Sequence, residues 1–461
     1  MLVVNHFSLR EYVSRYWLIF VATFFIAINV FFIFGVTFGI PLADEWRWLK
    51  ELLIPLHRGE ISAFDYLIGE YAFLAHSHYL ALLFLWLDFA WFDLNFSYFT
   101  YIGVVFYVLT YGAILLYLKR YLQQDLRVNI AAILILSVGY FCITSDFPWL
   151  LVMFEYVYFF IAIVTLLMLD SYLGGRTRLS LLLLMLLACL FLADTIGMAA
   201  VFMSLLVLFF NAIFVRKQRA AFLIVTSLVV SVFALQYWFL GAGIGVSTHS
   251  RADTLLLMLH NPIDVLMSFM SAFCQPLVNI EVLNPVVGNR TAAILQLVIS
   301  VCGFILTIFA CFFYYKSGGL KKSQLPLIFI GYSLLAWALI FISRYQDYGV
   351  SVIDEPRYAR LFTLIYVGIG LAFLCMNHTA QTRKMLFLVA GALMLGYGGT
   401  VSYKYWQDQY IESYFANAKI ELMREQINSE ELAKYIGRCA NDYCVEPVAF
   451  MKENKLSVFA D

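Results

Sequence analysis

The sequence predicts an all-α polytopic membrane protein with about eleven transmembrane helices. Of its 461 residues, 63% are hydrophobic and 13% are charged, and the mean hydropathy is +0.84. A soluble domain carries about 25% charged residues. Apolar runs of about 20 residues, long enough to cross the hydrocarbon core of a bilayer, recur along most of the chain. A transmembrane barrel is excluded, because its strands would alternate apolar and polar residues in segments of about ten.

The apolar runs place the predicted spans along the chain. The first run, from Tyr16 to Ile40, is too long for the apolar part of a signal peptide, so we interpret it as a span. The segment 77–93 is apolar but short and carries Asp88 and Asp93, which favours an interfacial or re-entrant helix. The predicted spans are 16–38, 96–118, 128–143, 150–170, 179–193, 195–215, 220–240, 291–313, 325–342, 360–376 and 384–402.

Basic residues predict the orientation of these spans. With the N-terminus in the cytoplasm, the inner segments hold 15 of the 30 Lys and Arg residues but only three acids, Glu11, Asp125 and Asp170. Such an excess of Lys and Arg is typical of cytoplasmic loops. The inner segments are 1–15, 118–127, 170–178, 215–219, 316–322 and 377–384.

The segments on the opposite side are longer, which indicates that the protein works on its outer face. They are 39–95, 241–290, 343–359 and 403–461. We therefore divide the chain into a transmembrane bundle, 1–402, with interfacial helices in its first outer segment, and a non-cytoplasmic tail, 403–461. Apolar residues recur at helical spacing in the tail and predict a small helical structure there. Cys439 and Cys444 predict a disulfide in the tail, which fits an oxidising compartment.

Ionisable residues gather near the outer ends of the spans, although such side chains are costly near a membrane core. One outward-opening polar cavity would collect them, with acids from the early part of the chain and arginines from the late part. Alternatives stay open: aspartates suit helix caps, and arginines near span ends bind ordinary lipid headgroups or pair with nearby acids. The residues are Asp44, Glu45, Glu70, His76, His78, Asp146, Glu155, Asp194, Arg344, Arg357 and Arg360.

Composition and motifs exclude several classes of function. The formal net charge is zero, so no basic face indicates nucleic-acid binding. No Walker A sequence occurs, and GAGIG at 241–245 lacks the preceding strand and the spacing of a dinucleotide-binding loop. The chain therefore carries no sign of a soluble nucleotide-binding domain.

Several short motifs, spread in order over nearly the whole chain, resemble one family. They are ADEW (43–46), EYAFLAHSHYLALLFLWLD (70–88), FPWLLVMFEYVYFF (147–160), LADTIGM (192–198), SRYQDYGVSVIDEPRYAR (343–360) and KLSVFAD (455–461). The acidic pair after the first span, the long first outer segment and the arginine-rich last outer loop resemble the GT-C superfamily of integral-membrane glycosyltransferases. Within it, the chain is similar to bacterial O-antigen-modifying, serotype-converting glucosyltransferase-like proteins.

That resemblance implies a function and a location. The expected activity is transfer of a sugar, with inversion, from a polyprenyl-phosphate donor to an acceptor glycan such as O-antigen or another cell-surface polysaccharide or lipid. The expected location is the inner membrane of a bacterium, with the active site facing the periplasm. The expected partners are the lipid-linked donor, the glycan acceptor and the bilayer, and no nucleic acid.

The chemistry assigns roles to the residues. A carboxylate beside the reacting hydroxyl can take its proton, and a neighbouring acid can raise the pKa of that carboxylate toward working pH. We predict Asp44 as this general base and Glu45 as a supporting residue. The leaving phosphate needs fixed cations, which arginine supplies through bidentate hydrogen bonds. The predicted substrate-binding residues are Arg344, Tyr345, Arg357, Arg360, Glu70, His76, His78 and Glu155.

The sequence defines no certain cofactor. A divalent cation, Mg²⁺ or Mn²⁺, is an open alternative, with Glu45, His76 and His78 as its candidate ligands. A His-x-His pair at an interface is more often just hydrogen-bonded.

Three other functions are alternatives to glycosyl transfer. A transporter or flippase for a lipid-linked saccharide would also need a polar cavity, but the sequence lacks visible repeats and paired Gly/Pro-broken spans. An O-antigen polymerase or ligase would use Arg and His in a large late loop, whereas 343–359 is small. A membrane-bound O-acyltransferase needs a histidine within a span, and none of the seven histidines clearly lies in one.

Overall fold

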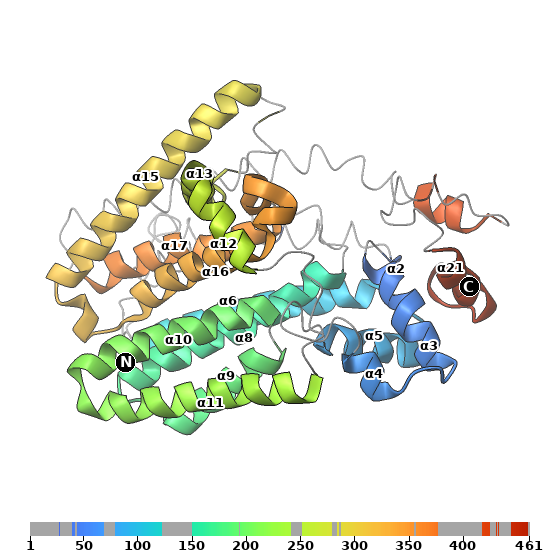
Figure 1. Cartoon of the computed structure of the whole chain (residues 1–461), viewed down its shortest axis with the longest axis horizontal. Helices are drawn as coiled ribbons and strands as arrows, with labels where there is room; N and C mark the ends of the chain where they lie inside the picture. The colour runs from blue at the N-terminus through green and yellow to red at the C-terminus, as the bar shows by residue number, and fades with distance from the viewer. Residues whose placement is uncertain are drawn as a thin grey trace, which may run out of the picture. The chain divides into compact units, whose positions relative to one another are not determined.

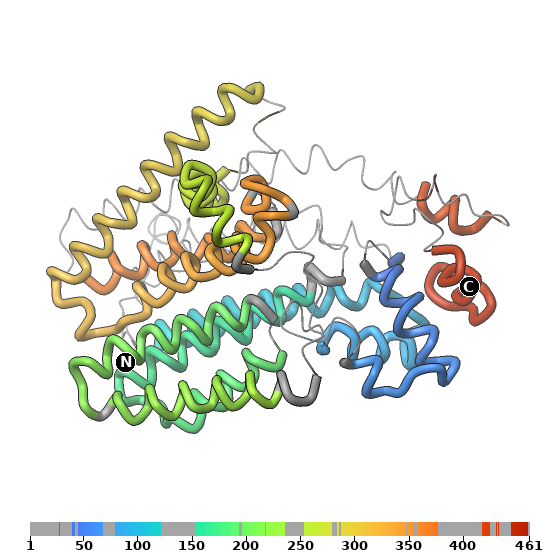
Figure 2. The backbone as a smooth tube through the Cα atoms, in the orientation of Figure 1, coloured from blue at the N-terminus to red at the C-terminus, as the bar shows by residue number. Residues whose placement is uncertain are grey.

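Every regular element in the described part of the chain is a helix, as the sequence predicts (Figures 1 and 2). The computed structural model describes residues 27, 39–41, 44–68, 79–121, 150–192, 194–240, 251–278, 284, 287–354, 356–376, 417–424, 430, 432 and 444–459, a few of them by backbone alone. These helices form two compact units. Unit 1 comprises Met1–Phe31, Tyr111–Ile143 and Met258–Tyr403, and unit 2 comprises Phe32–Thr110, Thr144–Leu257 and Lys404–Asp461.

Seven described helices are long and apolar enough to cross a membrane. They match seven of the eleven predicted spans and confirm the class of a polytopic helical membrane protein. The predicted span 179–193 is a helix of only 14 residues, and 16–38 (apart from residue 27), 128–143 and 384–402 lie outside the described residues. The seven are Ser97–Arg120, Phe154–Leu173, Ile196–Phe214, Gln218–Leu235, Asn289–Lys316, Leu325–Gln346 and Tyr358–Cys375.

Unit 2 contains a group of long helices. They are α6 (Ser97–Tyr121, which extends into unit 1), α8 (Leu150–Leu173), α9 (Leu179–Leu192), α10 (Asp194–Phe214) and α11 (Arg216–Leu240). Edge-to-face aromatic pairs join the first half of α6 to α8: Phe106 with Phe160 at 5.4 Å and Tyr107 with Tyr156 at 5.9 Å between ring centroids. At the α10–α11 turn, Arg219 Nε donates to the carbonyl of Ala212 at 3.0 Å. A cation at a helix C-terminus is favourable, so this basic turn also caps α10.

The first outer segment, 39–95, forms short helices at one end of this group (Figure 1). They are α2 (Asp44–Trp48), the π-helix η1 (Leu49–Leu53), α3 (Ile54–His57), α4 (Ala63–Ile68) and α5 (Tyr79–Phe92). A capping box starts α4, because the N–H of Asp65 donates to Ser62 Oγ while the N–H of Ser62 donates to Asp65 Oδ2. The Tyr66 hydroxyl then donates to the carbonyl of Leu82 at 2.7 Å and holds α4 on α5.

Helix α5 has a buried and an exposed side, although Asp88 is its only charged residue. Ala81, Leu82 and Leu85 are buried, whereas Trp86 and Trp91 are exposed. Its 14 residues are fewer than the ~20 that a bilayer requires, which agrees with the prediction that 77–93 does not span. Its depth in the membrane stays a prediction.

The described part of the tail is helical and packs in unit 2. A turn of helix at 417–422 is followed by α21 (Val445–Glu453) and the 3₁₀ turn η5 (Ser457–Phe459). Lys452 Nζ donates to the carbonyl of Arg424 at 2.6 Å and joins the two parts. Residues 404–461 thus belong to the same compact unit as the first outer segment. The predicted domain boundary at residue 402 stays a prediction.

Cys444, directly before α21, is disulfide-bonded and fully buried. Five other described cysteines form no disulfide: Cys189, Cys274, Cys302, Cys311 and Cys375. The predicted partner, Cys439, lies outside the described residues.

Unit 1 is built around a completely buried helix. Its elements are α13 (Pro262–Cys274), α15 (Asn289–Lys316), η2 (Gly319–Lys321), α16 (Leu325–Tyr348), η3 (Gly349–Asp354) and α17 (Pro356–Cys375). Every residue of α17 from Tyr358 to Cys375 is buried. The Tyr366 hydroxyl of α17 donates to the carbonyl of Phe273 on α13 at 2.5 Å, and Ser333 Oγ of α16 donates to the carbonyl of Leu361 at 2.7 Å. These bonds fix α17 between α13 and α16.

The sequence interpretation of 241–290 as an outer loop was incomplete. This segment contains α12 (Arg251–His260) and α13, which together are apolar enough for a span but bend by 95° at a break between them. Asn261 and Pro262 stand at the break, and proline cannot continue the hydrogen-bond ladder of the preceding helix. The pair is a broken span or a re-entrant loop.

Candidate functional site

The acidic pair begins a continuous helical stretch, α2–η1–α3. Glu45 and Trp46 are completely buried, at 0% exposure each. The indole N–H of Trp46 makes no hydrogen bond, which is unusual for a buried donor. The side chain of Asp44 lies outside the described part of the structure. The burial of Glu45 disagrees with the interpretation of this segment as a solvated helix end.

A π-helix follows the acidic pair directly. In η1, Leu49, Leu52 and Leu53 are buried, and π-helical turns occur frequently at functional sites. Arg47 Nε donates to Glu51 Oε2 at 2.6 Å across this stretch, with both side chains about one third exposed. This ion pair lies on the partly exposed side of the helix, whereas Glu45 lies on its buried side.

The other predicted acids and histidines are only partly covered by the structure. Glu155 is half-buried on α8, between the fully buried Phe154 and the buried Tyr156. Its Oε2 atom is shielded from solvent and makes no hydrogen bond, although the residue has a polar contact elsewhere. The remaining members, Glu70, His76, His78 and Asp146, and the side chain of Asp194, lie outside the described residues.

No group of three or more metal-type ligands occurs in the described part of the chain. Because His76 and His78 lie outside that part, the alternative of a divalent cation held by Glu45 and these histidines stays a prediction.

The arginine-bearing segment of unit 1 is more helical than the sequence indicates. We predicted that the span ends at residue 342, with Arg344 following it, but α16 continues to Tyr348 and contains Arg344. Arg344 lies over the ring of Tyr348, with 5.8 Å from its guanidinium carbon to the ring centroid. Such a cation–π contact orients the guanidinium. The short η3 then leads into α17.

Arg360 is the most deeply buried cation of the described chain, at 2% exposure. It lies one turn inside α17, near the N-terminal end of a candidate span. Arg357 is three residues earlier in the same helix, as predicted, but its side chain lies outside the described structure. A buried guanidinium is costly, so this position is held by the packing of unit 1 rather than by solvent.

Tyr345, a predicted substrate-binding residue, lies in the interior of unit 1. It is buried, and its hydroxyl donates to Asp264 Oδ2 on α13 at 2.8 Å. Asp264 was missed by the sequence analysis, because 241–290 was interpreted as a loop. Its signal is an acid in the first turn of an apolar helix that follows Asn261-Pro262. A role of Tyr345 as a substrate contact stays a prediction.

A further residue that the sequence analysis did not select is Asp88. It is 3% exposed in α5, and both oxygens of its carboxyl group are shielded from solvent. Burial raises the pKa of Asp88 to about 7, the backbone N–H of Asn95 partly opposes this, and the charge of Asp93 adds to it. A lone acid in the apolar run FLWLDFAWF was the available signal.

Comparison of the chain with protein-family models, with curated proteins and with solved structures finds no match. The resemblance to GT-C glycosyltransferases therefore stands on the motifs alone, and the function has to be argued from chemistry.

The described site residues fall into two sets, one in each unit. Unit 2 holds a buried carboxylate, Glu45, beside the backbone of Asp44, together with the protonatable Asp88. Unit 1 holds Arg344 and Arg360 on neighbouring helices. Carboxylates with altered environments serve as proton acceptors, and guanidinium groups bind phosphate. The prediction that one outer cavity collects all these residues stays a prediction.

Proposed function

We propose that this protein transfers a sugar from a polyprenyl-phosphate-linked donor to an acceptor glycan on the non-cytoplasmic face of a bacterial inner membrane. The observation that carries the proposal is the complete burial of Glu45, next to Asp44, directly after a predicted span. A helix end that serves only to reach water would keep its carboxylates solvated. A chain that buries an acid there needs it for something other than solubility.

In this reaction the acceptor hydroxyl attacks C1 of the sugar while the bond from C1 to the phosphate oxygen breaks. Asp44 takes the proton of the hydroxyl, and the electron pair of the broken bond leaves with polyprenyl phosphate. We assign Glu45 a supporting role, because it is completely buried and lies next to Asp44 in the sequence.

The arginines match the other half of the reaction. The phosphate gains negative charge as the sugar leaves, and preorganised donors in a water-poor site stabilise such charge. Arg360 is removed from water and Arg344 is oriented by Tyr348, so both are held before any ligand binds. A lipid-linked donor also explains why the protein is a membrane bundle: the substrate lies in the bilayer.

The test uses full-length protein in lipid vesicles, with polyprenyl-phosphate-linked glucose as donor and O-antigen lipopolysaccharide as acceptor. We expect release of polyprenyl phosphate that depends on the acceptor. Asp44→Asn keeps the shape and removes the base, so turnover should fall by about 10² to 10⁴. Glu60→Gln is the matched control, because Glu60 is an exposed carboxylate of the same segment, 3.9 Å from Arg58. Equal turnover in Asp44→Asn and Glu60→Gln would remove Asp44 from the reaction.

Transport of a lipid-linked saccharide is the second candidate, and one observation favours it. Helices broken near the middle of the membrane form the substrate sites of many transporters, and the α12–α13 pair is bent by 95°. In the same vesicles, a transporter would move the lipid-linked glucose between leaflets without releasing polyprenyl phosphate. The two activities are thus separated by one product measurement.

A further inference from the structure

The first outer segment has a neck, where its two ends meet: Gly39 at one end, and Asn95 and Ser97 at the other. A Cβ atom on Gly39 would lie 3.0 Å from Asn95 Oδ1 and 3.2 Å from Ser97 Oγ. Gly39 also has a φ of +62°, which side chains disfavour. Glycine is therefore required here both by conformation and by the close approach of the other end.

The end of the chain bonds to both sides of this neck. The backbone N–H of Ser457 donates to the carbonyl of Asp93 at 2.5 Å. The hydroxyl of Ser457 donates to the carbonyl of Gly39 at 2.7 Å, across 418 residues of sequence. One residue thus ties together the two ends of segment 39–95.

Backbone strain is concentrated at this contact. In the described part of the chain, four residues other than glycine have a left-handed backbone, with φ between 52° and 56°. They are Asp93, Leu94, Lys455 and Ser457, two on each side of the contact. Such residues persist where the surroundings over-determine them, and they cluster at clamps and switches. Leu94 is fully buried, and its N–H donates to the carbonyl of Asp88.

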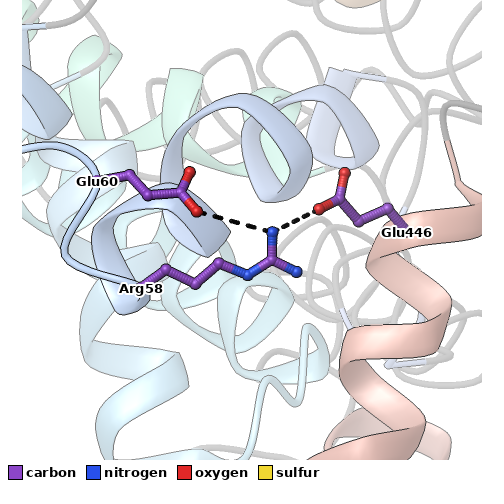
Figure 3. Close-up of polar contacts among 3 residues, drawn as sticks. All are labelled: Arg58, Glu60 and Glu446. Carbon is purple, nitrogen blue, oxygen red and sulfur yellow. Dashed lines mark hydrogen bonds and ion pairs between the residues drawn. The ribbon is translucent and has the colours of Figure 1, made fainter.

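Helix α21 makes a second contact with the same segment (Figure 3). Arg58, just after α3, donates to Glu446 at 2.7 Å and lies 3.9 Å from Glu60. The centroid of the His57 ring lies 5.2 Å from that of Phe89 and 5.3 Å from that of Phe450, and both pairs pack edge to face. The tail therefore rests on α3 and α5 before it reaches the neck, and the two regions must lie on the same side of the membrane.

We propose that the C-terminal turn Lys455–Phe459 is a latch, in which Ser457 holds the neck of the first outer segment closed and so positions helix α2. Helix α2 begins five residues after Gly39, and the intervening Ile40 and Pro41 are buried. A shift of Gly39 is therefore passed to the acidic pair. Ser457 is a positioning residue, since it bonds to the backbone of Gly39 and touches no reacting group. Its effect on catalysis rests on the proposed function, whereas the latch itself does not.

The latch can be tested by hydrogen–deuterium exchange of the full-length protein in lipid nanodiscs. Ser457→Ala removes only the hydroxyl bond to Gly39. Ser457→Pro also removes the N–H donor and cannot adopt a φ of +55°. Lys455→Gly is the matched control, because it relaxes a left-handed residue of the same turn whose N–H is bonded within the tail, to Lys452.

We expect faster exchange in the peptides that cover 39–54 and 88–99, by about five- to tenfold for Ser457→Ala, the factor that one ordinary hydrogen bond gives, and more for Ser457→Pro. Lys455→Gly should leave these peptides unchanged, and peptides from α8 and α10 should be unchanged in all variants. If Ser457→Pro fails to fold, Ser457→Ala carries the test. Exchange at 39–54 in Ser457→Ala equal to that in Lys455→Gly would overturn the latch.

Donor turnover separates positioning from plain stability. In Ser457→Asn, the new asparagine tolerates a left-handed backbone, and its amide can donate to the Gly39 carbonyl. In Ser457→Asp, the side chain has the same shape as asparagine, but its carboxylate cannot donate. We expect kcat to fall in Ser457→Asp with KM unchanged, and to be restored in Ser457→Asn. Equal kcat in these two variants would remove the positioning role. If the wild type releases no polyprenyl phosphate, the proposed function fails while the exchange result still decides the latch.

Discussion

The acid-bearing segment and the arginine-bearing segment are held in opposite ways. In segment 39–95, short helices, a π-helical turn and a strained turn are tied to residues 446–457 at the far end of the chain. In segment 344–360, one long helix and a 3₁₀ turn are held by neighbouring helices, with the bond from Tyr345 to Asp264 spanning 81 residues. The acids therefore depend on remote contacts, and the arginines on the packed interior of unit 1.

This difference predicts which segment a given substitution should disturb. A packed helix interior is rigid, because its side chains interdigitate at crystal-like density. A segment held by a few hydrogen bonds and one exposed ion pair opens more easily. Changes in the tail should therefore reach the acids and leave the arginines unaffected.

The largest effect on stability is expected from Asp88. Its carboxyl stays protonated in the fold up to a pH of about 7, whereas in the unfolded chain it ionises near pH 4. Between these values the folded state binds more protons, so stability falls as pH rises, by up to about 4 kcal/mol. In Asp88→Asn this dependence should disappear. Melting temperatures of wild type, Asp88→Asn and the exposed control Glu60→Gln, measured from pH 5 to 8, check this. Parallel pH profiles in all three would contradict it.

A smaller effect is expected at Arg344. Arg344→Lys keeps the charge but loses the planar fork that binds phosphate in a bidentate way. Loss of one charge-assisted hydrogen bond of about 1.5 to 3 kcal/mol should raise KM for the lipid-linked donor about tenfold or more. Lys316→Arg, at the far end of α15 in the same unit, is a control for altered lipid binding. If Arg344 only anchors lipid headgroups, Arg344→Lys will show the wild-type KM.

The smallest effect is expected from the ion pair between Arg58 and Glu446. Both side chains are more than one third exposed, so solvent screening limits the pair to about 0.5 kcal/mol. Arg58→Glu should speed hydrogen exchange modestly at residues 54–60, and the double variant Arg58→Glu with Glu446→Arg should restore it. If the double variant does not restore exchange at residues 54–60, or if exchange changes in peptides of unit 1, the two segments are not held as differently as inferred.

Much of the architecture follows from the sequence, because a membrane span is a local property. About 20 consecutive apolar residues suffice, and seven predicted spans coincide with helices of that kind. The short apolar run around Asp88 forms a helix of 14 residues, and its prediction as an interfacial or re-entrant helix stays a prediction. Where polar residues interrupt an apolar stretch, local reasoning fails. Because Asp253, His260 and Asp264 are polar, α12 and α13 were not predicted as helices. The polar residues between Ser343 and Tyr348 likewise made the predicted span end before α16 does.

The candidate site depended on tertiary structure in a way that no local pattern reveals. The sequence placed Asp44 and Glu45 after a span but could not tell a solvated end from a buried acid. Burial depends on which distant segments cover a residue. The same holds for Asp88, whose raised pKa comes from the packing around α5, and for Arg360.

The sequence by itself determined the helical membrane class, most of the spans and the residue types near their ends, because hydrophobicity and length act over about 20 neighbouring residues. The tertiary structure alone decided that Ser457 meets Gly39 and Asp93, that Tyr345 bonds to Asp264, and that Glu45 is shut off from water. Each of these requires segments far apart in the chain to meet, and such encounters are set by the packing of the whole fold.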